Sequence, residues 1–228
     1  MRKIVVAVFV SLDGVVQAPG GPEEDPTGGF TLGGWLPPLY DEVSGAAVGE
    51  LFERPFDLLL GRKTYDIFAA HWPFIQVDPA ASDFDALQAN IARKFGALTK
   101  YVATHRPESL SWQNSESLGP DVVARLRALK SGDGPDLVTQ GSSELLQLLF
   151  ANDLVDELRT LTFPVLLGRG KRLFGGPSPA AAFKLLKSIT TPNGIVVSSY
   201  TRAGEVKTGS FMLADPTPAE LERRRHLE

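Results

Sequence analysis

Hydrophobic residues occur along this chain in two alternating patterns: short continuous runs, and longer stretches with apolar residues at helical spacing. Continuous runs of β-branched and other apolar residues are typical of strands that are covered on both faces. The predicted strands are residues 3–11, 56–60, 98–104, 136–139, 156–163 and 195–202. Apolar spacings of three and four predict helices. The predicted helices are residues 40–53, 62–70, 120–130 and 142–151.

The order of these elements indicates the fold class. Strands that alternate with helices, and are then followed by strands alone, predict an α/β domain in which a mainly parallel sheet ends in an antiparallel pair. Glycine and proline interrupt the pattern over residues 12–38, which predicts one long loop. Such loops are commonly functional lids or mobile segments, and both interpretations stay open. Shorter turns are expected at residues 168–176 and 192–194, and Pro120 is expected in the first turn of its helix.

The C-terminal residues carry their own small signature. Thr217, Pro218 and Glu220 stand in the order of a capping hydroxyl, a first-turn proline and a reciprocal carboxylate, which predicts a short helix. The basic run at residues 223–225 lies beside glutamates. We therefore expect it to form a solvated face rather than a nucleic-acid patch.

Composition narrows the class of protein. The chain has 228 residues, of which 43% are hydrophobic and 22% charged, and this balance excludes a disordered or coiled-coil protein. We expect a single domain over residues 1–205 and a tail over residues 206–228, with residues 227–228 interpreted as a vector-derived addition.

Charge and cysteine content exclude several partners. A formal net charge of -4 provides no positive field for a nucleic-acid backbone, and the absence of cysteine excludes disulfides and thiolate metal sites. No apolar run approaches the roughly 18–20 residues that span a membrane. The basic and then apolar start is similar to a signal peptide but lacks a suitable cleavage site. We therefore expect a soluble, cytoplasmic protein that binds neither nucleic acid nor membrane.

The most informative chemistry lies at residues 58–65, where a predicted strand runs through Gly61 into a helix. At a helix N-terminus, unpaired N–H groups and the helix dipole favour a phosphate, and Arg62 and Lys63 would add positive charge. Neither the P-loop spacing nor the GxGxxG fingerprint is present. The segment could equally be a glycine turn with solvated cations.

Two other predicted strands end in residues suited to a phosphate. Residues 104–106 supply a hydroxyl, an imidazole and a guanidinium, and a guanidinium can bind a phosphate through two hydrogen bonds. Residues 141–143 precede a leucine-rich helix, where they would either meet a phosphate or only start the helix. Parallel sheets bind ligands at the carboxyl ends of their strands. We therefore expect the three strand ends to converge on one elongated, phosphate-bearing ligand.

Four motifs together resemble the dihydrofolate-reductase-like superfamily, and especially its branch with the riboflavin-biosynthesis reductase domain. They are Ser11-Leu12-Asp13-Gly14, Leu60-Gly61-Arg62-Lys63-Thr64-Tyr65, Gln140-Gly141-Ser142 and Phe163-Pro164-Val165-Leu166-Leu167-Gly168-Arg169-Gly170. The resemblance covers residues 3–202 in the same order. It implies a three-layer α/β fold with a mostly parallel central sheet and an antiparallel C-terminal strand pair, NADPH as the hydride donor, and a homodimer.

The resemblance also implies roles for individual residues. The residues that it implies at the cofactor phosphates are Gly61, Arg62, Lys63 and Thr64. The residues implied near the adenosine ribose and its 2'-phosphate are Thr104, His105 and Arg106. Those implied at the pyrophosphate are Gly141, Ser142 and Ser143. Many members have two glycines where this chain has Gln140-Gly141, which puts close approach of the backbone in question.

Candidates for the chemical step are two aspartates and a tryptophan. Asp13 would face the nicotinamide end or fill a turn, and Trp35 would stack on a planar ring or anchor the long loop. In folate-reducing members a carboxylate on the first helix pairs with the pterin, and Asp41 or Glu42 would take that place. His71 has no partner at metal-ligand spacing, so no metal site is expected.

The resulting hypothesis is an NADPH-dependent reductase of a small planar heterocycle, such as a pterin, a pyrimidine or a related C=N or C=O compound. An alternative is a non-catalytic dinucleotide-binding protein on the same fold. A homodimeric assembly protein without a small ligand is a third possibility.

Overall fold

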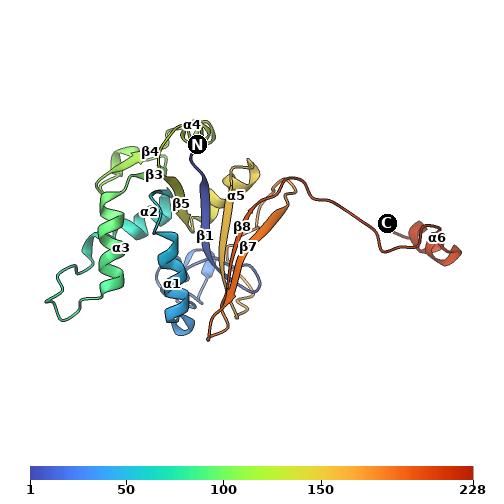
Figure 1. Ribbon diagram of the computed structural model, residues 1–228, viewed down its shortest axis with the longest axis horizontal. Coiled ribbons are helices and arrows are strands. Elements are labelled where there is room, and N and C mark those ends of the chain that lie inside the picture. Colours follow the sequence, from blue (N-terminus) through green and yellow to red (C-terminus); the bar gives the residue numbers. More distant parts are fainter. Residues whose placement is uncertain (228) are drawn as a thin grey trace.

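The computed structural model describes residues 1–227 and is built on a single eight-stranded sheet (Figure 1). The strand order is β4-β3-β2-β5-β1-β6-β8-β7. The strands are β1 (Ile4–Ser11), β2 (Phe56–Gly61), β3 (Lys100–Ala103), β4 (Ser115–Ser117), β5 (Asp136–Gln140), β6 (Glu157–Phe163), β7 (Phe183–Thr190) and β8 (Val196–Arg202). Strands β1 to β6 run parallel to one another, whereas β8 is antiparallel to both β6 and β7. The predicted mostly parallel sheet with antiparallel C-terminal strands is therefore confirmed.

Helices cover both faces of the sheet (Figure 1). They are α1 (Glu42–Leu51), α2 (Arg62–Ala69), α3 (Ala86–Ala97), α4 (Val122–Ser131), α5 (Ser143–Ala151) and α6 (Pro218–Arg225). Helices α1, α2 and α3 pack their apolar residues into the core on one face, and α4 and α5 into the core on the other. This arrangement confirms the predicted three layers.

Strand β1 lies near the middle of the sheet, between β5 and β6. Its alternate side chains enter the two cores: Val5 and Ala7 on the α1 face, and Val6 and Val8 on the α5 face. A strand covered on both faces is apolar at every position, which is why the continuous run predicted it correctly.

Three elements were not predicted, namely α3, β4 and β7. The edge strand β7 exposes Leu185 and Leu186, so its pattern lacks the buried alternation of an inner strand. Strand β4 has three residues and is defined by its pairing with β3. Helix α3 buries a stripe in which small alanines accompany Ile91 and Phe95, which weakens the apolar signal. Pro120 is also misplaced by the prediction, because Asp121 caps α4 and the proline precedes that cap.

The long loop at residues 12–38 is a packed part of the domain. It contains two short 3₁₀ turns, Thr27–Gly29 and Pro37–Leu39, and buries Val15, Phe30 and Trp35. The side-chain amide of Gln17 donates to the carbonyls of Asp25 and Thr27, both at 2.9 Å. Apolar anchors and buried hydrogen bonds thus hold the loop on the sheet.

The C-terminal segment leads away from the sheet to α6 (Figure 1). The predicted helix is confirmed, and the Thr217 hydroxyl accepts from the N–H of Glu220 at 3.2 Å. The expected reciprocal bond is replaced, because the Glu220 carboxylate pairs with Arg223 and Arg224. The basic run is thus an ion-paired, solvated face, as predicted. The prediction for residues 227–228 includes Glu228, which lies outside the described residues.

Candidate functional site

The three strand ends suited to phosphate lie side by side at one edge of the sheet. Strand β2 pairs with β3 on one side and with β5 on the other, and Gly61 is in register with Ala103. The N–H of Gly61 donates to the Ser142 hydroxyl at 2.8 Å, which joins the start of α2 to the start of α5. Residues far apart in the chain therefore form one continuous rim.

The helices that begin at this rim differ from the others at their N-termini. Within residues 1–227, four α-helices are capped by a side chain, supplied by Asp41, Asp85, Asp121 and Thr217. Helices α2 and α5 have no side-chain cap. Uncapped helix starts retain N–H donors and the positive end of the dipole, which together favour an anion. The two uncapped starts adjoin one another.

The backbone of the rim requires small residues at particular positions. A Cβ on Gly61 would lie 3.1 Å from the Cβ and Oγ atoms of Ser142, so the two helix starts approach closely only because residue 61 is glycine. Gly141 and Ser142 have φ angles of 79° and 62°, and the second is strained for a residue with a side chain. This chain therefore makes its sharp turn with Gly141-Ser142, and a glycine at Gln140 is not needed for it.

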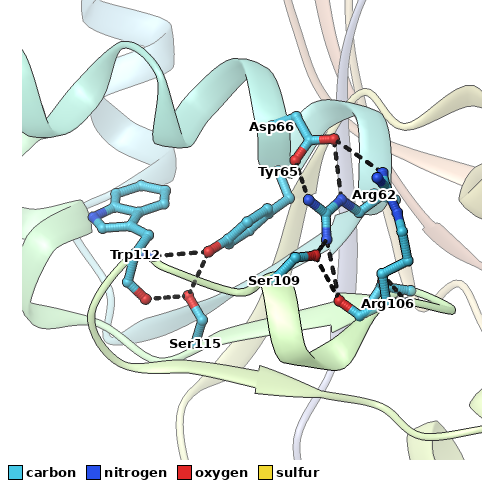
Figure 2. Close-up of polar contacts among 8 residues, drawn as sticks. Arg62, Tyr65, Asp66, Arg106, Ser109, Trp112 and Ser115 are labelled. Carbon is cyan, nitrogen blue, oxygen red and sulfur yellow. Dashed lines mark hydrogen bonds and ion pairs between the residues drawn. The ribbon is translucent and has the colours of Figure 1, made fainter.

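Two arginines share one carboxylate at the outer end of the rim, and Figure 2 shows their contacts. Arg62 donates to both oxygens of Asp66, at 3.0 and 2.6 Å, and to the Ser109 hydroxyl at 2.6 Å. Its Nη1 also donates to the carbonyl of Arg106 at 3.3 Å. The guanidinium of Arg106 lies 3.8 Å from Asp66. The hydrogen bonds to Asp66 raise the pKa of Arg62 above its ordinary value.

Sequence reasoning missed Asp66 and Ser109. The spacing of four between Arg62 and Asp66 on a helix is a signal that could have found the first. Ser109 lies in a turn at Pro107–Ser109 that carries no periodic pattern. Beside this cluster, the buried Tyr65 hydroxyl accepts from the N–H of Trp112 at 2.8 Å and fixes the segment before β4 (Figure 2).

The remaining cofactor-binding candidates lie along the same rim. The Thr104 hydroxyl accepts from the N–H of Arg106 at 3.0 Å and shapes the turn after β3. His105 and Lys63 are exposed. Thr64 and Ser143 are half-buried, in the first turns of α2 and α5.

Asp13 accepts several hydrogen bonds at the turn after β1. Its carboxylate accepts from the Ser11 hydroxyl at 2.6 Å and from the N–H groups of Leu167 and Gly168 at 3.1 and 2.9 Å. The Ser11 hydroxyl and these amides lower the pKa of Asp13 to about 2. The carboxylate therefore stays ionised and joins the turn after β1 to the segment after β6. These contacts are those of a residue that fills a turn, and the catalytic role of Asp13 stays a prediction.

The Asp41 carboxylate also accepts hydrogen bonds from the protein itself. It caps α1 by accepting from the N–H of Ser44 at 2.8 Å, and its other oxygen accepts from the N–H of Asn193 at 3.2 Å. Desolvation raises the pKa of Asp41, but hydrogen bonds from Ser44, Thr191 and Asn193 outweigh it and lower that pKa to about 2. A carboxyl group with this pKa holds no proton at neutral pH. The role of Asp41 in proton transfer stays a prediction, and its neighbour Glu42 is exposed.

Trp35 is a loop anchor. Its side chain is 8% exposed, its ring meets that of Phe163 edge to face at 5.4 Å, and its indole N–H donates to the carbonyl of Gln17 at 2.9 Å. Both the apolar body and the polar tip have partners. These contacts favour the anchoring interpretation, and stacking of Trp35 on a substrate stays a prediction.

A small pocket lies between α1 and the sheet, and sequence reasoning did not find it. Its floor includes residues paired across five strands, in the order Gln140, Ala7, Arg159, Ser199 and Lys187. Paired residues point to the same face of a sheet, so these side chains form one row. Because Gln140 directly precedes Gly141, the pocket adjoins the rim of the three strand ends.

Arg159 is the unusual member of this row. Its Nε is buried without a hydrogen-bond partner, and the carboxylate of Glu157 lies 3.6 Å from its Nη2. A buried donor without an acceptor costs about 1–3 kcal/mol. No sequence pattern marked Arg159, since only the pairing of β6 with β1 and β8 places it beneath α1.

Metal-ligand clusters and membrane-spanning helices are both absent from residues 1–227. This part of the chain contains no group of three or more His, Cys, Asp or Glu side chains arranged to hold a metal ion. None of the helices described within it is long and apolar enough to cross a membrane.

Comparison with known proteins identifies relatives of the whole domain. The family model described as the RibD C-terminal domain matches residues 2–197. The protein YyaP of Bacillus subtilis (strain 168) is 24% identical over 203 residues, which cover 87% of this chain and 94% of YyaP.

Two solved structures share the fold. A diaminohydroxyphosphoribosylaminopyrimidine deaminase/5-amino-6-(5-phosphoribosylamino)uracil reductase of Thermotoga maritima has a TM-score of 0.55 at 14% identity, covering 89% of this chain and 57% of that one. Dihydrofolate reductase of Enterococcus faecalis, complexed with NADP(H), has a TM-score of 0.51 at 13% identity, covering 88% of this chain and 96% of that one. At 13–14% sequence identity, the structural similarity shows only that the fold is shared.

Proposed function

Because the chain belongs to the RibD C-terminal domain family, we propose that it is an NADPH-dependent reductase of a small planar heterocycle, such as a pterin, a pyrimidine or a related C=N or C=O compound. The observation that carries the proposal is the pair of adjoining, uncapped helix starts at the neighbouring ends of β2 and β5. A rim of open N–H donors suits the phosphates of a dinucleotide.

The residues of the rim fit this cofactor. The first turn of α2, with Lys63 and Thr64, and the first turn of α5, with Ser143, would hold the phosphates through N–H and hydroxyl donors. The close approach at Gly61 keeps the two helix starts near enough to act on one ligand. When bound, NADPH would supply the hydride.

The arginine cluster would determine the choice of cofactor. Asp66 pairs with Arg62 and lies 3.8 Å from Arg106, and Glu108 is also near Arg62, so the more exposed Arg106 is the cation better placed to reach a ligand at the end of the rim. Arginine binds phosphate through paired, charge-assisted hydrogen bonds. We therefore assign this cluster to the 2'-phosphate, which NADPH has and NADH lacks.

The substrate ring would lie where the rim meets the pocket beneath α1, next to Gln140. The proton that accompanies hydride transfer would come from water or from a carboxyl group of the protein. The contribution of the protein is then to place the two rings and to exclude competing reactions.

A titration of purified protein with NADPH and NADH tests the proposal. Arg62→Met with Arg106→Met should weaken NADPH binding about tenfold or more, the loss expected for a charge-assisted hydrogen bond, and leave NADH binding within about threefold. Arg127→Met, which changes an exposed arginine on α4, is the matched control. Equal weak binding of both nucleotides, unaffected by the arginine variants, would remove the basis for the assignment.

The carboxylates of Asp13 and Asp41 already accept hydrogen bonds from the protein, which supports a second candidate function, a dinucleotide-binding protein without catalysis. An enzyme with an acid at Asp13 or Asp41 would leave that group free, and here both are engaged. Tight NADPH binding without any oxidation, across pterins, pyrimidines, quinones and aldehydes, would favour this alternative.

We also propose that the protein is a homodimer. Strand β7 forms an edge of the sheet, and its Leu185 and Leu186 are half exposed. An apolar edge strand is suited to association. Light scattering after size-exclusion chromatography measures the mass, and a monomer at micromolar concentration would contradict this proposal.

A further inference from the structure

The pocket beneath α1 has a charge that the structure leaves unbalanced. Two cations, Arg159 and Lys187, and one carboxylate, Glu50, line it, so the lining carries a net charge of +1. Lys187 and Glu50 pair with each other, at 2.8 Å, and both are about half exposed. The surplus charge therefore belongs to Arg159.

Glu157 is the carboxylate nearest to Arg159 outside the pocket, and it does not fully balance the charge of that guanidinium. Glu157 accepts a hydrogen bond from Lys3 at 2.6 Å, whereas its distance to the Arg159 guanidinium is 3.6 Å. The carboxylate is thus shared, and the closer cation is Lys3. The Nε–H of Arg159 has no acceptor and is buried. Buried donors in folded proteins are nearly always paired, so an orphan of this kind in a pocket indicates an acceptor that belongs to a ligand.

The dimensions of the pocket limit what this acceptor can be. The pocket is partly open, and its innermost space is small, about 30 Å³. A ring substituent can enter this space while the ring itself lies at the open side. The small side chain of Ala7 separates Arg159 from Gln140, so a ring at the rim can extend a substituent over Ala7 toward the guanidinium.

We propose that Arg159 is a substrate-binding residue, and that the substrate is a planar ring bearing an anionic oxygen group, such as a carboxylate or an ionised ring oxygen. The guanidinium binds this group in the pocket, and the ring lies over Ala7 and Gln140. Only the placement of the ring beside a nicotinamide rests on the proposed function. The ion pair of Glu50 and Lys187 forms the outer edge of the pocket and, being half exposed, opens at little cost.

Matched ligands test the proposal on the full chain. Orotate and uracil differ by a ring carboxylate, as do pterin-6-carboxylate and pterin, and calorimetry measures the affinity of each with and without saturating NADP⁺. We expect at least one acid to bind about tenfold or more tightly than its neutral partner. Arg159→Met should abolish this preference. Arg159→Lys should retain part of it, because lysine keeps the charge and loses the forked donors.

Controls separate this proposal from the reductase assignment. NADPH affinity should be unchanged in Arg159→Met, and Arg127→Met should bind all four ring compounds as the wild type does. A wild type without preference for either acid, or a preference that survives in Arg159→Met, overturns the proposal. If Arg159→Met does not fold, Arg159→Lys and the wild-type comparison still decide. A preference that depends on Arg159 in a protein that does not bind NADPH would support Arg159 and contradict the reductase.

Discussion

One edge of the sheet has two halves, and they differ in whether their hydrogen-bonding groups are already paired within the protein. At the ends of β3, β2 and β5, which we call the donor half, two helices begin without a side-chain cap. At the ends of β1 and β6 and the turn between β7 and β8, which we call the acceptor half, the carboxylates of Asp13 and Asp41 are filled by donors of the protein itself. Open groups indicate ligand binding, and filled ones indicate structure.

This difference explains why the sequence predicted more about ligand binding in the donor half than about the aspartates of the acceptor half. In the donor half the backbone binds the ligand, so a glycine and a helix start are sufficient and both are visible in the sequence. In the acceptor half the role of an aspartate depends on which donors reach it. Those donors come from Leu167, Gly168 and Asn193, more than 150 residues away along the chain.

The largest expected effect comes from closing the donor half. Gly61→Val places a branched side chain against Ser142, because a Cβ at residue 61 would already lie 3.1 Å from that side chain. The substitution should weaken NADPH binding about a hundredfold and cost roughly 1–3 kcal/mol of stability. Nucleotide titration and thermal unfolding measure the two effects.

Gly49→Ala in α1 is the control for this substitution. The added Cβ meets nothing within 4 Å, so NADPH affinity and stability should be unchanged or slightly improved. Normal NADPH affinity in Gly61→Val would show that the rim does not bind the cofactor.

The second prediction concerns Asp13 in the acceptor half. Asp13→Ala leaves the Ser11 hydroxyl and two N–H groups without their acceptor and should lower the free energy of unfolding by about 2 kcal/mol. Urea unfolding measures this, and NADPH affinity should not change. The opposite result, normal stability with loss of turnover, would restore Asp13 as a catalytic residue.

A smaller effect is expected at Asp41. Asp41→Ala removes the cap of α1 and the bond to Asn193, and it should lower the Tm somewhat more than Asp121→Ala, which removes only the cap of α4. The pH profile of turnover should be the same in both variants. A profile altered only in Asp41→Ala would mean that Asp41 takes part in proton transfer.

The smallest effect is the contribution of these carboxylates to acid stability. The pKa values of Asp13 and Asp41 are lowered to about 2 from 3.8, so the folded state holds these protons less tightly than the unfolded chain. Their contribution to stability is therefore complete above about pH 4 and is lost as the pH falls toward 2. Urea unfolding at a series of pH values should show a shallower decline for the double variant Asp13→Asn with Asp41→Asn. An identical decline would contradict the assigned hydrogen bonds.

Much of the fold followed from local patterns. The continuous apolar run of β1 and the leucine-rich α5 are largely buried stretches, and burial leaves a pattern that requires no knowledge of neighbours. The edge strand β7 escaped prediction because many of its residues face solvent. In β7, Leu185 and Leu186 are exposed, and pairing with β8 is what makes them a strand.

The sequence by itself determined the strand-glycine-helix segment at Gly61, the α/β alternation and the family, because each depends on residues that are neighbours along the chain. Only the tertiary structure decided which groups surround Asp13, Asp41 and Trp35, and only it brought Arg159 beneath α1. The physical reason is that backbone conformation is governed by local interactions, whereas the charge state and availability of a side chain are governed by the atoms that surround it in space.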